Sequence, residues 1–385
     1  MMNICFQFAF IAMALGFPLT SPDANVVSPP EEPAMEADDY VSLLLSEPDE
    51  DVVVLTPDNP WEFRLDFATI LQVEDHYVMY YRAIHKKHKP WMTICIATSE
   101  DGLHWTRPEL DVVNFKGVDG KNNIISEQWN GVGFEYRDGT YYLLADRLIA
   151  PDGETVDKTM HFYTSTDGIH FTEDTSVSIP FFCDSQNQIL WDPYAKKYRF
   201  YLRSWERNTS VLRKNLHSNN FYRMVSYCET GQNLRLGLSH AAKPLFLAGR
   251  DQSPAISTEL PVIIKNESQE DFDIYYAAVH QYLPDLFIAY PCNYYFTPDT
   301  GHGGELDNDG YATIGFWVSS NGKDFTEIKR DYITNGGNWL ESTIGHIETD
   351  DCLIHYYIPF ENTHVGKHQN NCIRARIHYK NRAEQ

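Results

Sequence analysis

The chain has 385 residues and a mass of 44.5 kDa, which is long enough to bury a sizeable core. Its formal net charge of −23 makes nucleic acid and anionic membrane surfaces poor partners, because like charges repel. Aromatic residues form 14% of the chain, and no long amphipathic helical pattern stands out. We therefore expect an all-β fold.

The N-terminal region is expected to precede the folded domain. The apolar run Ile4–Phe17 has the length of a signal-peptide core, and Ala24 is a candidate last leader residue, which favours a secreted or periplasmic protein. From Glu31 to Asp51 there are nine carboxylates and no Lys or Arg, which is typical of a poorly ordered acidic tether. We expect a signal peptide over residues 1–24, a tether over 25–51 and one domain over 52–385.

The first expected strand of the domain begins at an acid. Asp66 precedes the strand-like run Phe67–Val73, and Arg64 lies two residues earlier, on the same face of an extended chain. A guanidinium there would favour the ionised form of the Asp66 carboxyl. Asp184 precedes the run Ser185–Leu190 in the same way. Either acid could instead cap a turn or a strand.

One turn device occurs three times, at Ser99–Trp105, Ser165–Phe171 and Ser319–Phe325. Each copy places Asp-Gly or Asn-Gly three residues before an aromatic residue, and these residues accept the left-handed dihedrals of a tight turn between two strands. Trp105 and Phe171 are 66 positions apart, which suits a four-stranded unit. About five such units fill the domain, so the repeats predict a five-bladed β-propeller.

The segments Trp61–Arg82, Ala97–Ile125 and Asp184–Arg203 resemble exported bacterial glycosyl hydrolases of the five-bladed β-propeller type. These are distant relatives of the arabinanase/xylosidase and invertase/levanase groups. The relatives use a base or nucleophile from the first blade, an acid that orients substrate or tunes a pKa, and a glutamic general acid. The resemblance implies that Asp66 is the first acid and Asp184 a second essential carboxylate, whose role stays open.

The second blade departs from this pattern. Asn130 or Gly131 occupies the place where the relatives carry an acid, and Glu135 is displaced along the strand, as a substitute acid or a strand residue facing solvent. For the general acid we favour Glu341, because it follows Trp339 and Leu340 and opens an inner strand as Asp66 does. The alternatives are Glu259 and Glu305.

Several other residues are candidates for binding a sugar. Flat rings near the starts of inner strands stack on sugar faces, although packing between blades is the alternative for each; these are Trp61, Trp129, Trp205 and Trp339. Tyr276 and His280 are expected to face the channel. The candidate substrate-binding set is Arg64, Trp61, Trp129, Asn130, Glu135, Tyr276, His280 and Trp339.

No resident metal or cofactor is expected. The cysteines lack the paired short spacing of a zinc site. His280 or His346 is the one candidate ligand for a channel calcium ion, as a His is in some arabinanases.

We therefore expect a monomeric, secreted glycoside hydrolase-like protein that acts on a polysaccharide or oligosaccharide. Two alternatives remain open. A non-catalytic propeller could bind carbohydrate at a degenerate site, and a sialidase-like enzyme would use arginines such as Arg64 and Arg82 for a substrate carboxylate. Hydrolysis needs one carboxyl that stays protonated and one that stays ionised, about 5 to 9.5 Å apart, whereas binding alone does not.

Overall fold

The computed structural model describes residues 35–85, 92–115, 118, 121–147, 160–179, 183, 185–207, 221–231, 260–268, 272–297, 309–364 and 371–380. In this part of the chain the regular structure is one helix, α1 (Ala37–Leu45), and twenty β-strands, so the predicted all-β class is confirmed.

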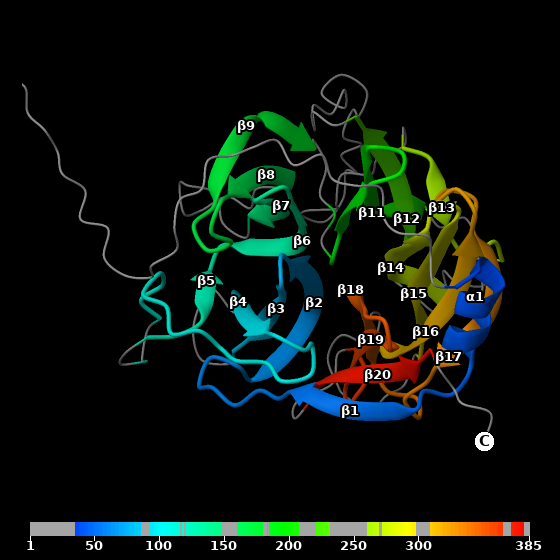
Figure 1. The fold of residues 1–385 in the computed structure, drawn as a ribbon, viewed down its shortest axis with the longest axis horizontal. Coiled ribbons are helices and arrows are strands. Elements are labelled where there is room, and N and C mark those ends of the chain that lie inside the picture. Colours follow the sequence, from blue (N-terminus) through cyan, green and yellow to red (C-terminus); the bar gives the residue numbers. More distant parts are fainter. Residues whose placement is uncertain are drawn as a thin grey trace, which may run out of the picture. The chain divides into compact units, whose positions relative to one another are not determined.

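The strands form antiparallel groups of four (Figure 1). The first two groups are β2–β5 (Arg64–Val73, His76–Ile84, Met92–Ser99, Ile124–Ser126) and β6–β9 (Trp129–Arg137, Thr140–Arg147, Met160–Ser165, Thr172–Ile179). The next two are β10–β13 (Gln188–Asp192, Lys197–Arg207, Phe221–Thr230, Val262–Ile264) and β14–β17 (Phe272–Leu283, Leu286–Phe296, Gly310–Ser319, Thr326–Ile333). The last group has the order β18–β19–β20–β1 (Leu340–Glu348, Cys352–Pro359, Ile373–Tyr379, Glu50–Leu55).

The first and last groups are continuous as one eight-stranded sheet. A single parallel pairing, Ile344 of β18 with Thr69 of β2, joins them. The innermost strands also contact one another in cyclic order: β2 with β6, β6 with β10, β10 with β14, β14 with β18, and β18 with β2. Strand β1 pairs antiparallel with β20, so the beginning of the domain supplies the outer strand of its last group.

The three predicted turns are confirmed, and each one locks two strand groups together. Gly102, Gly168 and Gly322 have φ values of +76°, +71° and +71°. Their carbonyls accept hydrogen bonds from tyrosine hydroxyls of an adjacent group; the donors are Tyr356 of β19, Tyr80 of β3 and Tyr201 of β11, at 2.7, 2.8 and 3.0 Å. A Cβ at Gly102 would lie 2.7 Å from the Tyr356 hydroxyl, so the contact requires glycine as well as the turn.

The part of the predicted tether from Met35 onward is ordered, and this differs from our expectation. Helix α1 places Tyr40 and Leu44 one turn apart on one face, and both are buried. Tyr40 donates a hydrogen bond to Glu348, and Leu44 accepts one from Tyr332. Asp38 and other acids occupy the first turn, where the helix dipole favours negative charge, so high acidity here accompanies order.

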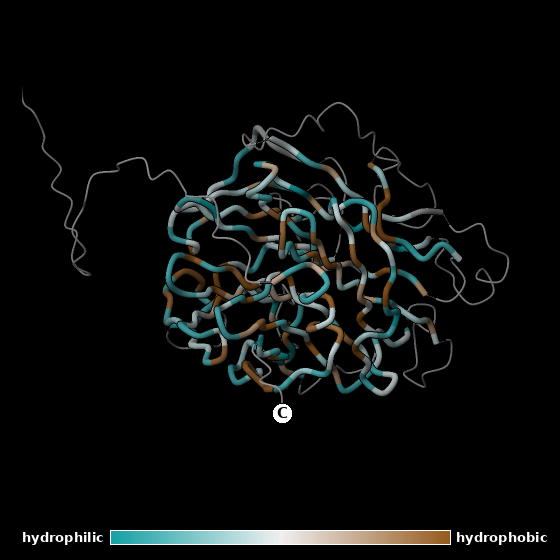
Figure 2. Tube along the Cα trace, turned by 45° about the vertical axis from the view of Figure 1, so that its right-hand side comes forward, coloured by the Kyte–Doolittle hydropathy of each residue, from teal (hydrophilic) through white to brown (hydrophobic). Residues whose placement is uncertain are grey.

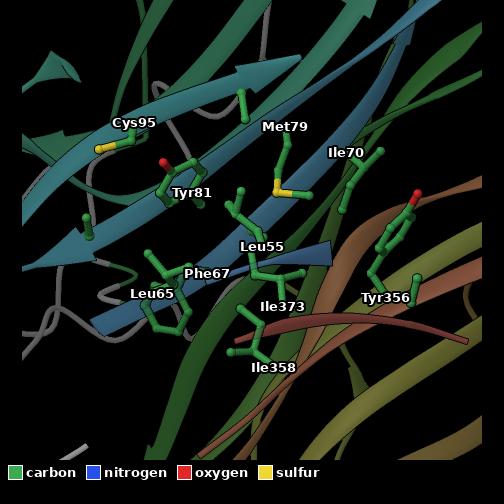
Figure 3. Packing of buried hydrophobic residues seen from close by; sticks show 14 of the residues in the cluster. Leu55, Leu65, Phe67, Ile70, Met79, Tyr81, Cys95, Tyr356, Ile358 and Ile373 are labelled. Carbon is green, nitrogen blue, oxygen red and sulfur yellow. The ribbon is translucent and has the colours of Figure 1, made fainter. Parts of the chain in front are cut away.

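The hydrophobic core joins the two ends of the domain. Leu55 of β1 and Ile373 of β20 pack with Leu65 and Met79 of the first group (Figure 3). Hydrophobic residues follow the strands, and the turns between them are mostly hydrophilic (Figure 2). Each fully buried aliphatic side chain contributes roughly 1.5 to 3 kcal/mol. Within the described ranges, no helix has the length and apolar character needed to cross a membrane.

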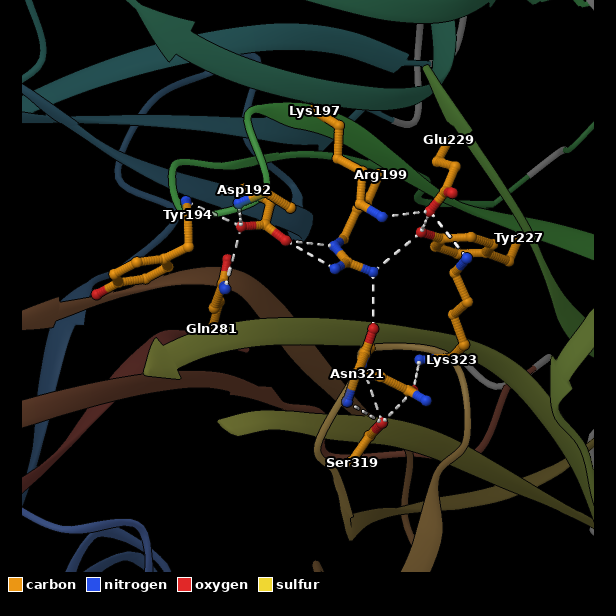
Figure 4. A network of polar contacts seen from close by, with 12 residues as sticks. Asp192, Tyr194, Lys197, Arg199, Tyr227, Glu229, Gln281, Ser319, Asn321 and Lys323 are labelled. Atoms are coloured by element: carbon orange, nitrogen blue, oxygen red, sulfur yellow. Dashed lines mark hydrogen bonds and ion pairs between the residues drawn. The ribbon is translucent and has the colours of Figure 1, made fainter. Parts of the chain in front are cut away.

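A polar network links the third and fourth groups (Figure 4), beside a buried hydrophobic cluster that the same two groups share. Arg199 of β11 donates to Asp192 at 2.9 and 2.7 Å, to the Tyr227 hydroxyl at 3.0 Å and to the Asn321 carbonyl at 2.8 Å. Asn321 belongs to the turn after β16, so one guanidinium links two groups. Glu229 extends the network by accepting a hydrogen bond from Tyr227.

Candidate active site

The candidate site lies where the innermost strands begin. Asp66, Asn130, Asp273 and Glu341 are the third, second, second and second residues of β2, β6, β14 and β18. All four are buried. The parallel pairing of β2 with β18 brings two of these starts to the same end of the fold, and hydrogen bonds between groups connect three of them.

Asp66 is held by two guanidinium groups. Arg82, the cross-strand partner of Asp66 on β3, reaches Oδ1 and Oδ2 at 2.6 and 2.9 Å, and Arg64 reaches Oδ2 at 2.9 Å. Burial alone would raise the pKa of Asp66, but the charges of Arg82 and Arg64 outweigh it, and the pKa is lowered. Asp66 is therefore ionised at neutral pH. Arg64 and Arg82, two of the arginines available to the sialidase-like alternative, are bound to this carboxylate.

Glu341 has the opposite electrostatic environment. Its Oε1 accepts a hydrogen bond from Trp339 Nε1 at 3.0 Å, and its Oε2 accepts one from the Phe67 backbone N–H at 3.1 Å. Burial, followed by the negative charge of Asp66, raises the pKa of Glu341 to about 7. The two carboxyl groups thus titrate far apart, as a proton donor and an ionised partner would.

A backbone irregularity brings the two acids together. Phe67 has a φ of +50°, which is strained for a bulky residue, and the β2–β3 register shifts between Asp66 and Thr69. This shift directs the Phe67 N–H to Glu341, while its ring lies 3.9 Å from the Arg82 guanidinium. Strand β6 bulges at the equivalent place, where Gly131 has a φ of +60°. A conformation that glycine adopts freely in β6 is thus imposed on Phe67 in β2.

Arginine and aromatic side chains lie close to Trp339 and Asp273. Arg223 reaches Asp273 at 3.2 Å, and Arg203 lies 4.3 Å from the Tyr275 ring. Tyr275 packs edge to face against Trp339 at 4.9 Å, so this group contacts the residue that donates a hydrogen bond to Glu341. Rings and guanidinium groups of this kind are suited to contacts with a sugar and its hydroxyls.

The sequence analysis missed Asp146. It is the penultimate residue of β7 and the cross-strand partner of Asn130, with 1% of its surface exposed. Arg82 ends the aromatic part of β3 in the corresponding position, and its Nη1 donates to Asn130 Oδ1 at 2.6 Å. In an antiparallel pair the end of the second strand lies opposite the start of the first, so an acid at either position reaches the same place in the fold.

Three of the predicted acids, Asp184, Glu259 and Glu305, lie outside the described residues. Among the predicted stacking residues, Trp61 and Trp129 are 6% and 9% exposed and belong to hydrophobic clusters. Trp339 is 2% exposed and holds Glu341 through its indole N–H. The structure therefore gives these three rings packing or positioning contacts.

The remaining predicted residues divide between the two ends of the strands. Tyr276 lies near the acids, with its ring edge to face with Phe67 at 5.6 Å and its hydroxyl bonded to the Ser342 carbonyl. Glu135 and His280 instead line a pocket at the other end, together with His346. Among the described residues, no group of three or more His, Cys, Asp or Glu side chains is placed to hold a metal ion.

No protein-family model matches the chain, and no curated protein matches its sequence. Its fold is similar to solved structures. One, described as "Glycoside hydrolase", has a TM-score of 0.54 at 12% identity over 89% of this chain and 95% of the other. A complex of BT0996 and RGII has a TM-score of 0.53 at 11% identity over 88% and 94%. The Bombyx mori GH32 beta-fructofuranosidase BmSUC1 has a TM-score of 0.48 at 11% identity over 88% and 66%. The first of these confirms the predicted resemblance at the level of the fold, which this chain shares with a solved glycoside hydrolase.

Proposed function

We propose that the chain is a glycoside hydrolase that acts on a polysaccharide or oligosaccharide, with Glu341 as the general acid and Asp66 as its ionised partner. One observation carries the proposal: two buried carboxyls at the starts of adjacent inner strands have their pKa values shifted in opposite directions. Such a pair is what glycosidic bond cleavage requires.

We also propose that the five strand groups are the blades of a five-bladed β-propeller. The support is the cyclic order of contacts among β2, β6, β10, β14 and β18, together with the strand pairing of β1 with β20. In this architecture the acids occupy one mouth of the central axis. Propellers bring residues that are distant in sequence to that axis.

The geometry assigns a task to each side chain. Glu341, with a pKa of about 7, is partly protonated at neutral pH and donates its proton to the leaving glycosidic oxygen. Asp66 either accepts a proton from the attacking water or attacks the anomeric carbon itself. Arg82 and Arg64 keep Asp66 ionised, and Trp339 and the Phe67 N–H fix the Glu341 carboxyl.

The test is release of reducing sugar from a panel of polysaccharides and oligosaccharides. Asp66→Asn and Glu341→Gln should each lower the rate by about 10² to 10⁴-fold. Glu348→Gln is the matched control, because Glu348 ends the same strand that Glu341 begins, and it should keep the rate. Activity that survives both Asp66→Asn and Glu341→Gln would refute the assignment.

A second candidate function is carbohydrate binding without catalysis. The double ion pair of Asp66 favours it, because a carboxylate held by two guanidiniums is a weak base. In that case the protein would bind a glycan from the panel in affinity electrophoresis and release no reducing ends.

The proposal places the protein in the periplasm or outside the cell, as a monomer. The support for export is the apolar run Ile4–Phe17 in the sequence, which lies outside the described residues. Fractionation of the producing cells and light scattering of the purified protein test the two statements.

A further inference from the structure

A second pocket lies at the opposite end of the innermost strands. It has a volume of about 370 Å³, and β2, β6, β10, β14 and β18 all contribute residues to it. Gln72 of β2 lines it, six residues beyond Asp66 on the same strand. At about 3.3 Å per residue, the two positions are separated by about 20 Å.

A buried polar layer separates this pocket from the acids. Gln186 donates to the Ala68 carbonyl, Gln188 exchanges two hydrogen bonds with the Val279 backbone, and Tyr276 donates to the Ser342 carbonyl. Gln186, Gln188 and Tyr276 are at most 2% exposed. Gln188 and Val279 themselves line the pocket, whereas Asp66 and Glu341 do not, so the pocket is a separate site from the one that holds these two acids.

Apolar side chains form about half of the pocket lining, and the polar groups among them are mostly uncharged, as Gln72, Gln188 and Gln281 are. Among the described residues that line it there is no Lys or Arg, and Glu135 is the one carboxyl. Glu135 accepts hydrogen bonds from the backbone N–H groups of Trp191 and Tyr136. Burial lowers the pKa of His346 to about 4 and holds that of His280 well below its usual value, so both imidazoles are neutral at pH 7.

Two lining groups lack a hydrogen-bond partner. His280 Nδ1 and Gln281 Oε1 are buried, and neither has a partner among the described residues. His280 Nε2 donates to the Thr343 carbonyl at 3.3 Å, which leaves Nδ1 of the neutral ring as an acceptor. Both vacant positions are therefore acceptors, and a buried acceptor left unpaired costs about 1 to 3 kcal/mol. A ligand rich in hydroxyl donors would satisfy them.

We propose that this pocket binds a small, uncharged polyhydroxyl molecule of monosaccharide size. A volume of about 370 Å³ is at the small end of ligand pockets. An amine is a poorer fit, because burial raises the pKa of Glu135 to about 7, so the one carboxyl of the lining is only partly ionised at neutral pH. The choice of a sugar as ligand rests on the proposed function, whereas the pocket and its acceptors do not.

The test is titration of the full-length protein with glucose, galactose, xylose and arabinose, followed by ligand-observed NMR and calorimetry. We expect saturable binding of at least one sugar. Gln281→Leu removes the vacant acceptor and should weaken binding by about tenfold. Gln72→Leu changes an exposed rim residue, so it should weaken binding with no effect on folding. Gln128→Leu makes the same change at an exposed position outside this pocket and should leave binding unchanged.

Two outcomes would overturn the inference. One is the absence of saturable binding for all four sugars. The other is binding that Glu341→Gln abolishes while Gln281→Leu and Gln72→Leu preserve it, since the sugar would then occupy the mouth. Hydrolysis and binding at this pocket fail independently: a protein that hydrolyses no glycan yet binds a sugar in a manner sensitive to Gln281→Leu refutes only the proposed function.

Discussion

The starts of β2 and β6 are built alike but hold different chemistry. Both strands bulge just after their mouth residue, and both place a residue with positive φ there, Phe67 in β2 and Gly131 in β6. In β2 the acid is on the first strand and its cross-strand partner is an arginine. In β6 an amide, Asn130, is on the first strand and its partner is Asp146. In each group two paired residues, one at the start of the first strand and one near the end of the second, occupy the equivalent place. The acid is on the first strand in one group and on the second strand in the other.

The largest expected effect comes from breaking the β2 pair. Arg82→Met should lower the free energy of unfolding by about 3 to 5 kcal/mol, because it leaves the buried Asp66 charge with one remaining partner. Arg64→Met should cost less, since Arg64 makes one contact and its side chain is 22% exposed. Urea denaturation measures the unfolding free energy of both variants. Equal losses of stability in the two would contradict the larger role that we give to Arg82.

The next prediction concerns the β6 bulge. Gly131→Ala forces a left-handed φ on a residue with a Cβ and places that Cβ 3.0 Å from Asp146 Oδ1. We expect a loss of about 1 to 3 kcal/mol in unfolding free energy. Gly139→Ala is the matched control, because its φ is +76° and no atom lies within 4 Å of the added Cβ. If both variants lose the same unfolding free energy, the contact with Asp146 does not contribute to the loss in Gly131→Ala.

A third prediction rests on the difference in charge between Asp66 at the start of β2 and Asn130 at the start of β6. Asn130 carries no charge, so the pH dependence of hydrolysis should follow Asp66 and Glu341. The pKa of Glu341 is raised to about 7, so its proton is lost as pH rises through 7, and the rate should fall by about tenfold per pH unit above that value. Below pH 7 the rate should hold while Asp66 remains ionised, because its pKa is lowered. A rate that keeps rising from pH 7 to pH 9 would exclude Glu341 as the general acid.

The smallest expected effect concerns the hydrogen bond between Tyr80 of the first strand group and the Gly168 turn of the second. Tyr80→Phe removes the hydroxyl that donates to the Gly168 carbonyl and should cost about 1 kcal/mol in unfolding free energy. Tyr356→Phe and Tyr201→Phe remove the corresponding bonds elsewhere and should cost similar amounts. Thermal unfolding of the three variants checks whether the turns contribute equally to holding the groups together.

Much of the fold could be predicted, because its signals are local. Asp-Gly and Asn-Gly turns encode φ > 0 directly, and Gly102, Gly168 and Gly322 have it. Asp66 and Glu341 stood out because each opens an inner strand, and the structure brings both starts together. Helix α1 was missed because charge dominates its composition, whereas the two buried residues that anchor it, Tyr40 and Leu44, form a short pattern.

The end of the innermost strands at which a residue lies could not be predicted. Alternation along a strand indicates the face of a side chain but not the end of the molecule at which it lies, so Glu135 and His280 were grouped with the mouth residues. Bulges that shift register cannot be read from alternation either, and Asp146 became visible only through its pairing with Asn130. The burial of Trp61 likewise depends on residues distant in sequence, since its indole N–H donates to Asn123.

The most direct test of the account is the pKa of the Glu341 carboxyl, measured by ¹³C NMR of labelled protein and assigned by comparison with Glu341→Gln. We predict a value of about 7, set by burial and by an Asp66 that stays ionised throughout the titration. A Glu341 carboxyl that titrates near the ordinary value for glutamate, about 4.3, would mean that the site lacks a proton donor at neutral pH and would contradict the proposal.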